Sequence, residues 1–333
     1  MMKYFRLATI CLSVLAVSAT AFGQGPKARG IELYGQKNYP DAIRLLSIAS
    51  KDKATASDPA VWSYLGLANI ESGKVKNAQK AFEQAVKLDP KNSSYRVNLA
   101  YAYMLARKID KAQEALKTAI ALDPKNLAAY YLRGRSNLWE HHLDDALQDS
   151  EAILAIDPSY ASAYILKSDV LVSKVGERLV SGSFGGLSAG SVQLKDAKDT
   201  LEQGLAHSKS IEDKAQLQRE LESITAFYEY SIKKPKSPGS SPESNVTPLT
   251  ILTKPKASYT NRARDRGVTG KIQLAVLFGA SGRVEQVLVM KRLGYGLDEN
   301  AIGAAAAMQF KPKMVDGKPV STVMIIEYRF DIL

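Results

Sequence analysis

Two adjacent histidines and three carboxylates lie close together in this 333-residue sequence, in the stretch Glu140-His141-His142-Leu143-Asp144-Asp145. Imidazole and carboxylate groups are ordinary ligands of zinc and other divalent metals. Adjacent histidines diverge on a helix, however, and a repeat pattern described below places the stretch at a turn between two helices. The stretch is therefore more typical of a polar turn, and we predict no metal site.

Other residues with catalytic chemistry are isolated from one another. Cys11 is the single cysteine and lies in an apolar N-terminal run, while His207 has no partner that the sequence identifies. The glycine-rich stretch at 180–191 lacks the Gly-Lys-Ser/Thr ending and the preceding strand of a phosphate-binding loop, so it indicates an insertion between helices. The sequence therefore predicts a protein that is not an enzyme and needs no cofactor.

A spacing of 34 residues organises the region after the N-terminus, where Pro90, Pro124 and Pro158 recur at this interval. Small residues alternate with large ones at matching positions, and the first full unit has Trp62, Leu65, Gly66, Ala78, Phe82 and Ala85. The pattern resembles the tetratricopeptide repeat (TPR), in which pairs of helices stack. The resemblance implies an all-α solenoid over 24–232, with units at about 24–58, 59–92, 93–126, 127–160 and 161–208 and a capping helix from Ile211 to Ile232.

Such a solenoid has a concave surface that suits peptides or protein partners. Candidate residues for this surface lie on the first helix of each unit: Asn69, Asn98, Tyr101, Arg133 and Asn137. The alternative for each of them is an ordinary solvated helix residue.

The last part of the chain, 249–333, has the patterns of a small α+β domain. In the stretch 271–278, Ile272, Leu274, Val276 and Phe278 alternate with the other residues, which predicts a strand with one apolar face. A glycine-containing turn leads to a second strand at 284–290, and an alanine-rich helix at 301–307 ends before Pro312. A final strand at 320–331 puts its even-numbered residues on one face, so the order is β-β-α-β.

Several short motifs follow one another in this segment: Lys254-Pro255, Tyr259-Thr260, Ala263-Arg264, Gly270, Gly282, Leu297-Asp298 and Phe310-Lys311-Pro312. Their order resembles the C-terminal domain of TonB, the envelope protein that engages outer-membrane receptors. Thr260 stands where that family commonly has proline, and Met308 where it commonly has tryptophan. The resemblance implies a binding module in the bacterial periplasm.

A three-stranded sheet has open edges, which an extended peptide can complete by adding a strand. In TonB the last strand pairs with a receptor segment, so the resemblance implies that the final strand here is the docking edge. The candidate residues are Tyr259, Arg264, Val323, Ile325, Glu327 and Arg329. The alternative is an edge that the charged residues merely protect.

The N-terminus has the composition of a secretory signal peptide, which we expect at 1–23. Lys3 and Arg6 precede an apolar run from Leu7 to Val17, which is short for a membrane helix of about 20 residues. Cleavage after Ala21 or Gly23 would place the protein in the periplasm, whereas retention would anchor it in the inner membrane. Residues 233–248, rich in proline, serine and lysine, are expected to form a linker between the two domains.

The formal net charge is +11, of which residues 249–333 contribute +6, while the solenoid is nearly neutral. The basic excess suits anionic envelope surfaces or acidic receptor segments. Nucleic acid is excluded, since an exported chain would not meet it and the basic residues lack interleaved aromatic platforms. The sequence thus predicts a periplasmic adaptor that binds proteins or extended peptides, with TonB-dependent outer-membrane receptors as candidate partners. The alternative is a membrane-anchored energy transducer of the TonB type, acting in outer-membrane transport.

Overall fold

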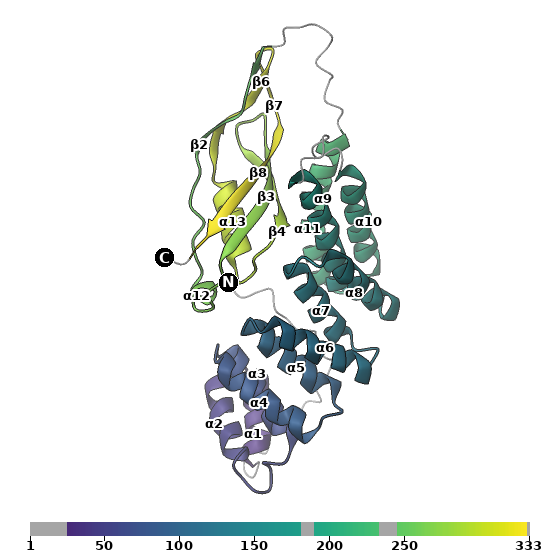
Figure 1. Ribbon diagram of the computed structural model, residues 1–333, viewed down its shortest axis with the longest axis vertical. Helices are drawn as coiled ribbons and strands as arrows, with labels where there is room; N and C mark the ends of the chain where they lie inside the picture. Colours follow the sequence, from purple (N-terminus) through teal and green to yellow (C-terminus); the bar gives the residue numbers. More distant parts are fainter. Residues whose placement is uncertain (1–24, 181–189, 233–244, 332–333) are drawn as a thin grey trace. The chain divides into compact units, whose positions relative to one another are not determined.

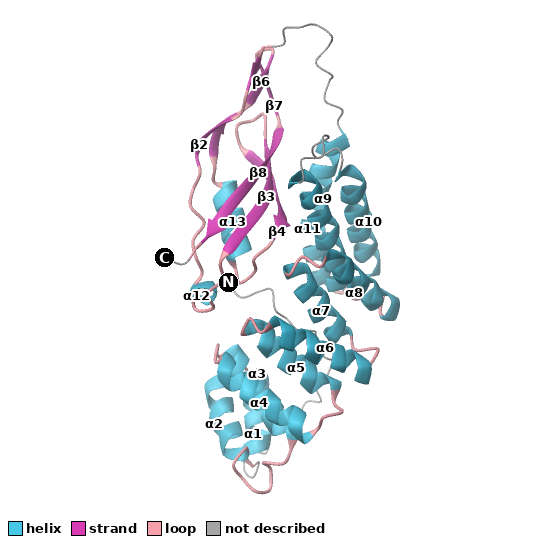
Figure 2. Cartoon of the chain, in the orientation of Figure 1, coloured by secondary structure: helices cyan, strands magenta, loops and turns pink. Residues whose placement is uncertain are grey.

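The structure is a computed structural model that describes residues 25–180, 190–232 and 245–331. Helices occupy its N-terminal part, and all the strands of the described residues follow residue 245 (Figures 1 and 2). The predicted insertion at 180–191 and linker at 233–248 lie mostly outside the described residues. The chain divides into two compact units, one up to Ser136 and one from Asn137, which are taken in turn.

Helices of the first unit come in antiparallel pairs joined by short turns. They are α1 (Pro26–Gly35), α2 (Tyr39–Ala49), α3 (Pro59–Glu71), α4 (Val75–Leu88), α5 (Ser93–Leu105), α6 (Ile109–Leu122) and α7 (Leu127–Trp139), the last of which crosses the boundary between the units. Asn38, Asp58 and Asn92 begin α2, α3 and α5 by accepting a hydrogen bond from a first-turn amide. These pairs confirm the predicted helical repeat.

Close approach of the two helices in a pair depends on glycine. A Cβ atom at Gly66 of α3 would lie 2.4 Å from a ring carbon of Phe82 in α4, and one at Gly30 of α1 would lie 2.7 Å from Leu46 in α2. Phe82 and Leu46 are fully buried. Each large side chain therefore fills the space that the glycine leaves, as the repeat pattern predicts.

The turn between the helices of a pair has a left-handed residue at the same place in each unit. Lys37, Gly73, Arg107 and His141 have φ of 61°, 72°, 57° and 66°. Three of the four are not glycine, so the turn accepts a conformation that costs side-chain-bearing residues about 1 kcal/mol. His141 is thus a turn residue, as its position in the repeat predicts.

The second unit begins with longer helices: α8 (Leu143–Ile156), α9 (Ala161–Val180), α10 (Ser191–His207) and α11 (Ile211–Ile232). Helix α9 has 20 residues, whereas α3, α5 and α7 have 13 each. The additional two turns of α9 carry Val175 and Gly176, which face the sheet of this unit.

Strands of the second unit form three small sheets. The bounds are β1 (Val246–Thr247), β2 (Thr250–Thr253), β3 (Gly270–Phe278), β4 (Val284–Lys291), β5 (Gln309–Lys311), β6 (Lys313–Val315), β7 (Lys318–Val320) and β8 (Thr322–Phe330). The largest sheet has the order β4-β3-β8 and is antiparallel throughout. Two short helices, α12 (Asn261–Arg264) and α13 (Leu297–Ala306), complete the domain, so the order β3-β4-α13-β8 confirms the predicted β-β-α-β core.

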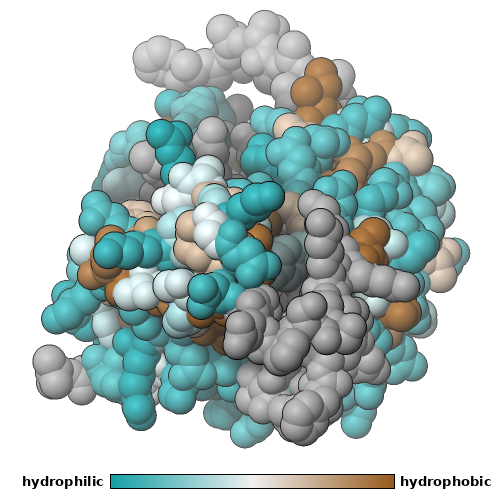
Figure 3. Space-filling view, turned by 90° about the horizontal axis from the view of Figure 1, so that it is seen from above, coloured by the Kyte–Doolittle hydropathy of each residue, from teal (hydrophilic) through white to brown (hydrophobic). Residues whose placement is uncertain are grey.

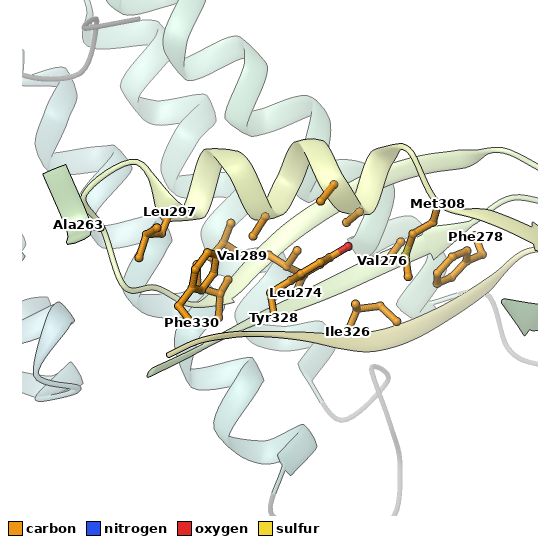
Figure 4. Packing of buried hydrophobic residues seen from close by; sticks show 14 of the residues in the cluster. Ala263, Leu274, Val276, Phe278, Val289, Leu297, Met308, Ile326, Tyr328 and Phe330 are labelled. Carbon is orange, nitrogen blue, oxygen red and sulfur yellow. The ribbon is translucent and has the colours of Figure 1, made fainter. Parts of the chain in front are cut away.

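Helix α13 covers one face of the main sheet (Figure 4). The sheet contributes Ile272, Leu274, Val276, Phe278, Val289, Ile326, Tyr328 and Phe330 to this core. The even-numbered residues of β3 and β8 are the ones that the alternation predicts on a common face. Phe278 meets Phe310 of β5 edge to face, with ring centroids 4.8 Å apart. Met308, at the position where TonB proteins commonly have tryptophan, is buried in the same core.

The opposite face of the main sheet packs against the helices α9 and α11. Ala275, Leu277, Leu288 and Met290 share one apolar cluster with Val172 and Val175 of α9 and with Ile224 and Phe227 of α11. A Cβ atom at Gly176 would lie 3.0 Å from the Cβ atom of Met290, so glycine permits this close approach. The end of the helical region and the sheet therefore form a continuous core.

The short strands were not predicted. β1 pairs with β6, β6 with β7, and β2 with β5. Val246 and Thr247 of β1 fall inside the stretch predicted to be a linker, so ordered structure begins before residue 249. These strands are two to four residues long, which is too short to show a hydrophobic period in the sequence.

Candidate functional site

The outer edge of β8 is the part of the main sheet that best suits another strand. β3 is central, so β4 and β8 form the two edges, and β4 contacts α9 and α11 through one face. Among the described residues β8 pairs with β3 alone, in an unbroken register from Thr322 to Phe330. Met324 and Ile325 in the middle of β8 are 37% and 36% exposed. The strand thus presents an accessible apolar stretch next to its unpaired backbone.

A side chain marks which backbone groups of β8 point outward. The Lys254 ammonium donates a hydrogen bond to the carbonyl oxygen of Glu327 at 2.8 Å, and it lies 5.0 Å from the centroid of the Tyr328 ring. Because the N–H and C=O of one residue in an antiparallel strand point to the same side, the odd-numbered residues of β8 direct theirs away from β3. Val323, Ile325, Glu327 and Arg329 therefore have the backbone groups that an added strand would use.

Charged side chains in the C-terminal half of β8 are paired locally. Glu327 accepts a hydrogen bond from Gln273 at 2.8 Å and forms an ion pair with Lys271 at 2.9 Å, and these contacts hold the pKa of Glu327 below its usual value. Arg329 and Asp331 form a pair that is largely exposed. These ion pairs run along the strand and across to β3, so they do not cover the outer backbone of β8, which Lys254 contacts at the Glu327 carbonyl.

Tyr259 and Arg264 lie near the end of β8. The Tyr259 ring meets Phe330 edge to face at 5.6 Å, and its hydroxyl donates to the carbonyl of Val268. The Arg264 guanidinium is 5.8 Å from the Tyr259 ring centroid. Thr260 begins α12 by accepting a hydrogen bond from Ala263. The structure therefore brings these two predicted residues to the same end of the sheet as the final strand.

Comparison with protein families separates the two regions. Residues 255–332 match the family described as Gram-negative bacterial TonB protein C-terminal, and residues 41–164 match the family described as cytochrome c-type biogenesis protein H TPR domain. The chain combines a TPR domain with a TonB C-terminal domain. Both domains are protein-interaction folds. No curated protein matches the chain.

Solved structures that resemble the chain are TPR proteins. The MamA protein is 20% identical over 57% of this chain and 92% of its own, with a TM-score of 0.44. The thermophilic TPR protein TTC0263 of Thermus thermophilus is 19% identical over 60% of this chain and 97% of its own, also at 0.44. The first TPR of Spaghetti (RPAP3), solved with an HSP90 peptide, is 25% identical over 34% of this chain and 91% of its own, at 0.33.

Three of the five residues predicted for the concave surface of the TPR domain are buried. Asn69 is 3% exposed and donates to the carbonyl of Leu65, Tyr101 is 5% exposed, and Asn137 is 7% exposed and donates to Asp149. Asn98 is half-buried and donates to Ser63 at 3.4 Å. Arg133 lies 5.5 Å from the Tyr130 ring centroid. Of these five, the half-buried Asn98 and Arg133 leave more of their side chains accessible to a partner.

A group of half-buried tyrosines on the TPR domain was missed in the sequence. Tyr34 of α1 contacts Tyr64 of α3 edge to face at 5.6 Å and Tyr39 of α2 at 5.9 Å. Burial, and then the negative charge of Glu71, raises the pKa of Tyr34 to about 12. A signal existed in the composition, because the chain has 16 tyrosines, but their positions vary from unit to unit and no repeat motif specifies them.

Opposite charges meet where the TPR helices contact the TonB C-terminal domain. Residues 137–232 have 16 Asp and Glu against 8 Lys and Arg, whereas residues 249–333 have 13 Lys and Arg against 7 Asp and Glu. The Arg292 guanidinium lies 2.6 Å from the Asp169 carboxylate of α9, and both side chains are largely buried. Ser223 of α11 also bonds to Gln286 of β4 at 3.2 Å. The near-neutral charge predicted for the solenoid as a whole therefore conceals an acidic end that faces a basic domain.

Arg292 is surrounded by carboxylates. Burial alone would lower its pKa, but Asp169, Asp298 and Glu220 together raise it above its usual value. Burial raises the pKa of Glu220 and of Asp298, and Arg292 opposes both shifts. Asp298 also accepts hydrogen bonds from the amides of Leu293 and Gly294. One arginine thus compensates the buried negative charge of several groups from both sides of the contact.

The metal-like stretch at 140–145 has other partners. His141 lies 3.0 Å from Glu177, and Asp144 pairs with Lys174 at 2.6 Å. His207 stacks on Tyr164 at 6.1 Å and bonds to the carbonyl of Gln203. In the described ranges no group of three or more metal-ligating side chains is placed to hold an ion, and no helix is both long and apolar enough to cross a membrane.

The surface has few large apolar patches where it can be seen. In the view of Figure 3, hydrophobic residues form small separate patches among hydrophilic ones. A contact through one broad apolar area is therefore not favoured on that face.

Proposed function

We propose that the protein is an adaptor of the bacterial cell envelope that is not an enzyme. In this proposal the TPR domain holds one protein partner, and the TonB C-terminal domain docks an extended segment of an outer-membrane receptor or another envelope component by strand addition. The observation that carries the proposal is the outer edge of β8, where the odd-numbered residues direct backbone groups outward beside the exposed Met324 and Ile325, and where only the Glu327 carbonyl has a side-chain partner, Lys254, among the described residues.

The two edges of the main sheet support this assignment by their difference. β4 is in contact with α9, α11 and α13, whereas β8 has its exposed apolar residues in the middle of the strand. An added strand would gain hydrogen bonds from the outward backbone and side-chain contacts from Met324 and Ile325. A segment with alternating apolar residues suits this combination.

Replacement of one residue tests the edge directly. Ile325→Pro removes an outward N–H but no hydrogen bond between β8 and β3, because only the even-numbered residues bond to β3. We expect synthetic peptides that copy the N-terminal segments of TonB-dependent receptors to bind the full chain, and Ile325→Pro to weaken that binding about tenfold or more. Ile325→Ala, which keeps the N–H and removes most of the side chain, serves as the matched control and should weaken binding clearly less than Ile325→Pro does.

Equal binding by the wild-type chain and Ile325→Pro would rule out docking through this edge. Circular dichroism of each variant shows whether the sheet is intact, so a loss of binding can be separated from a loss of fold. If no receptor-derived peptide binds the wild-type chain, the receptor part of the proposal fails.

Location in the periplasm is part of the same proposal, and a membrane-anchored energy transducer is the alternative. The intact mass of the protein, taken from the soluble periplasm and from membranes separately, distinguishes the two. A soluble chain that lacks about its first 21 to 23 residues supports the adaptor. A full-length chain in the membrane fraction supports the transducer.

A further inference from the structure

Tyrosines from three successive units lie close together on the TPR domain. Tyr34 of α1 is in contact with Tyr64 of α3, and Tyr39 at the start of α2 adjoins Tyr34. Tyr95 is half-buried on the next first helix, α5. The first helices of these units contact one another, α1 with α3 and α3 with α5. The four tyrosines are called here the tyrosine surface: three of them are in ring contact, and Tyr95 lies on the adjoining helix.

Each ring of the tyrosine surface is half-buried, and each hydroxyl lacks a hydrogen-bond partner in the part of the chain that the structure describes. Within residues 25–180, 190–232 and 245–331 none of the four hydroxyls makes a hydrogen bond, whereas the hydroxyls of Tyr103 and Tyr164 bond to Glu83 and to the carbonyl of Pro158. A half-buried tyrosine presents an apolar ring and a polar tip together. The surface thus offers flat apolar contact with several hydrogen-bond donors that the described residues leave unused.

Carboxylates flank the tyrosine surface. Burial, followed by the charge of Glu71, raises the pKa of both Tyr34 and Tyr39. Burial, followed by the charges of Asp89 and Asp58, raises the pKa of Tyr95. Asp58 already pairs with Lys27, but Glu71 is exposed and has no ion pair among the described residues. The charge at the Glu71 end therefore suits a cationic side chain.

We propose that the tyrosine surface binds a proline-rich segment that carries lysine. A polyproline II chain has no internal hydrogen bonds, so its carbonyl oxygens are free to accept from tyrosine hydroxyls. Its proline rings pack on aromatic side chains, and its preformed shape lowers the entropy cost of binding. A lysine of the segment reaches Glu71. This rests on the proposed adaptor function and deepens it by naming the chemical class of the partner that the TPR domain holds.

Other ligands fit the same surface less well. A strand would need backbone donors and acceptors in a row, and tyrosine side chains offer no register for it. An amphipathic helix satisfies its own carbonyls and would leave the hydroxyls unpaired. An acidic peptide would meet Glu71 and Asp89, which bear the same charge. The extended proline-rich segment is the ligand that uses the rings, the hydroxyls and the carboxylate together.

The test is the affinity of a fluorescent synthetic peptide, three repeats of Lys-Pro-Pro, for the full chain. We expect Tyr64→Phe, which removes one hydroxyl and keeps the ring, to weaken binding about three- to tenfold, the size of one net hydrogen bond. Tyr103→Phe is the matched control, since the Tyr103 hydroxyl bonds to Glu83 and lies outside the tyrosine surface. That variant should bind like the wild-type chain.

Companion peptides test each part of the chemistry. Three repeats of Lys-Ala-Ala should bind at least about tenfold more weakly, because that peptide lacks both the rings and the preformed shape. Glu71→Gln should reduce the preference for Lys-Pro-Pro over Ser-Pro-Pro repeats. Equal affinity of wild type and Tyr64→Phe, equal binding of Lys-Ala-Ala, or no binding of Lys-Pro-Pro would each overturn the proposal. Ile325→Pro should leave this binding unchanged, so failure here is distinct from failure of docking at β8.

Discussion

The two faces of the β4-β3-β8 sheet are both buried, but by different parts of the chain. One face is covered by α13, which lies between β4 and β8 in the sequence. The other is covered by α9 and α11, which belong to the helical region that precedes the sheet in the sequence. The first face is the core of a TonB C-terminal domain in its own right. The second makes the end of the TPR helices part of the same structural unit.

Two adjacent residues of β4 show that the two faces of the sheet contact different helices. Leu288 and Val289 are both 6% exposed, yet Leu288 contacts the cluster of α9 and α11 while Val289 contacts the cluster of α13. A strand that buries both faces reads as a nearly continuous apolar run. The domain therefore has to be regarded as a sheet between two helical layers, and its stability depends on residues outside it.

The largest expected effect follows from placing a charge in the contact with α9 and α11. Leu288→Asp would bury a carboxylate without a partner, and we expect it to lower the free energy of unfolding by about 3 kcal/mol or more. Urea denaturation followed by circular dichroism measures the loss. Leu252→Asp is the control, because Leu252 is 55% exposed and its replacement should change the same quantity by less than about 0.5 kcal/mol.

Hydrogen exchange then shows where the loss is felt. Leu288→Asp should speed amide exchange in α9 and α11 as well as in the sheet, whereas Val289→Ala should speed it mainly in α13. If α9 and α11 exchange at wild-type rates in Leu288→Asp, the two faces do not differ as described and the helices do not depend on the sheet.

Removal of Arg292 should have the next largest effect. Arg292→Met leaves Asp169, Glu220 and Asp298 without their compensating charge, and we expect a loss of about 2 to 3 kcal/mol in the free energy of unfolding. Arg329→Met is the control, because Arg329 and Asp331 are 69% and 59% exposed and their pair should contribute less than about 1 kcal/mol.

The pH dependence of Arg292→Met gives a second check. Burial raises the pKa of Glu220 and of Asp298, and without Arg292 their pKa values would rise further. A carboxyl group with a raised pKa in the folded state binds its proton more tightly there than in the unfolded state. The folded variant is therefore favoured at low pH and loses stability as pH rises through those values. Mild acidification should recover part of the loss, and a variant equally unstable at every pH would contradict this account.

The face of the sheet that α13 covers could be predicted from the sequence. The alternation of Ile272, Leu274, Val276 and Phe278 with their neighbours identifies the strand and its buried face, because α13 is local and the period is regular. Ala275 and Leu277 are the apolar residues that mark the second face of this strand. They alternate with the buried set together with the polar Lys271 and Gln273, so the sequence pattern does not identify that face as buried. Nothing in the sequence says which distant helix covers them, since that depends on the extra turns of α9 reaching the sheet.

The candidate sites divide in a similar way. The outer edge of β8 could be predicted, because it follows from strand order and from the resemblance to TonB. The tyrosine surface could not be predicted, because Tyr34, Tyr64 and Tyr95 occupy different positions in their repeats. Only the stacking of the helices brings them to neighbouring places. Asn69 and Asn137 were chosen by their polarity, but in the structure each bonds within the helices and is buried.

Replacing one glycine on each side of the sheet should change the free energy of unfolding by a smaller amount, with a loss at Gly176 in α9 and a gain at Gly303 in α13. Gly176→Ala in α9 would press a methyl group against Met290, where a Cβ atom would lie 3.0 Å from the Met290 Cβ, and we expect a loss of about 1 kcal/mol. Gly303→Ala in α13 meets no atom within 4 Å, so the helix propensity of alanine should raise the free energy of unfolding by about 0.5 to 1 kcal/mol. Urea midpoints measure both. A gain in both variants would show that α9 does not approach the sheet closely.

The smallest effect is expected for an ion pair on the acidic helices. Lys174 of α9 pairs with Asp144 of α8 at 2.6 Å, but the Asp144 side chain is 94% exposed. In water such a pair gains little, because solvent and salt screen the attraction and two flexible side chains must be held. Lys174→Met should therefore change the free energy of unfolding by less than about 0.5 kcal/mol, against about 3 kcal/mol for Leu288→Asp. A large loss in Lys174→Met would mean that surface charge, rather than the apolar contact of α9 and α11 with the sheet, holds this end of the helical region together.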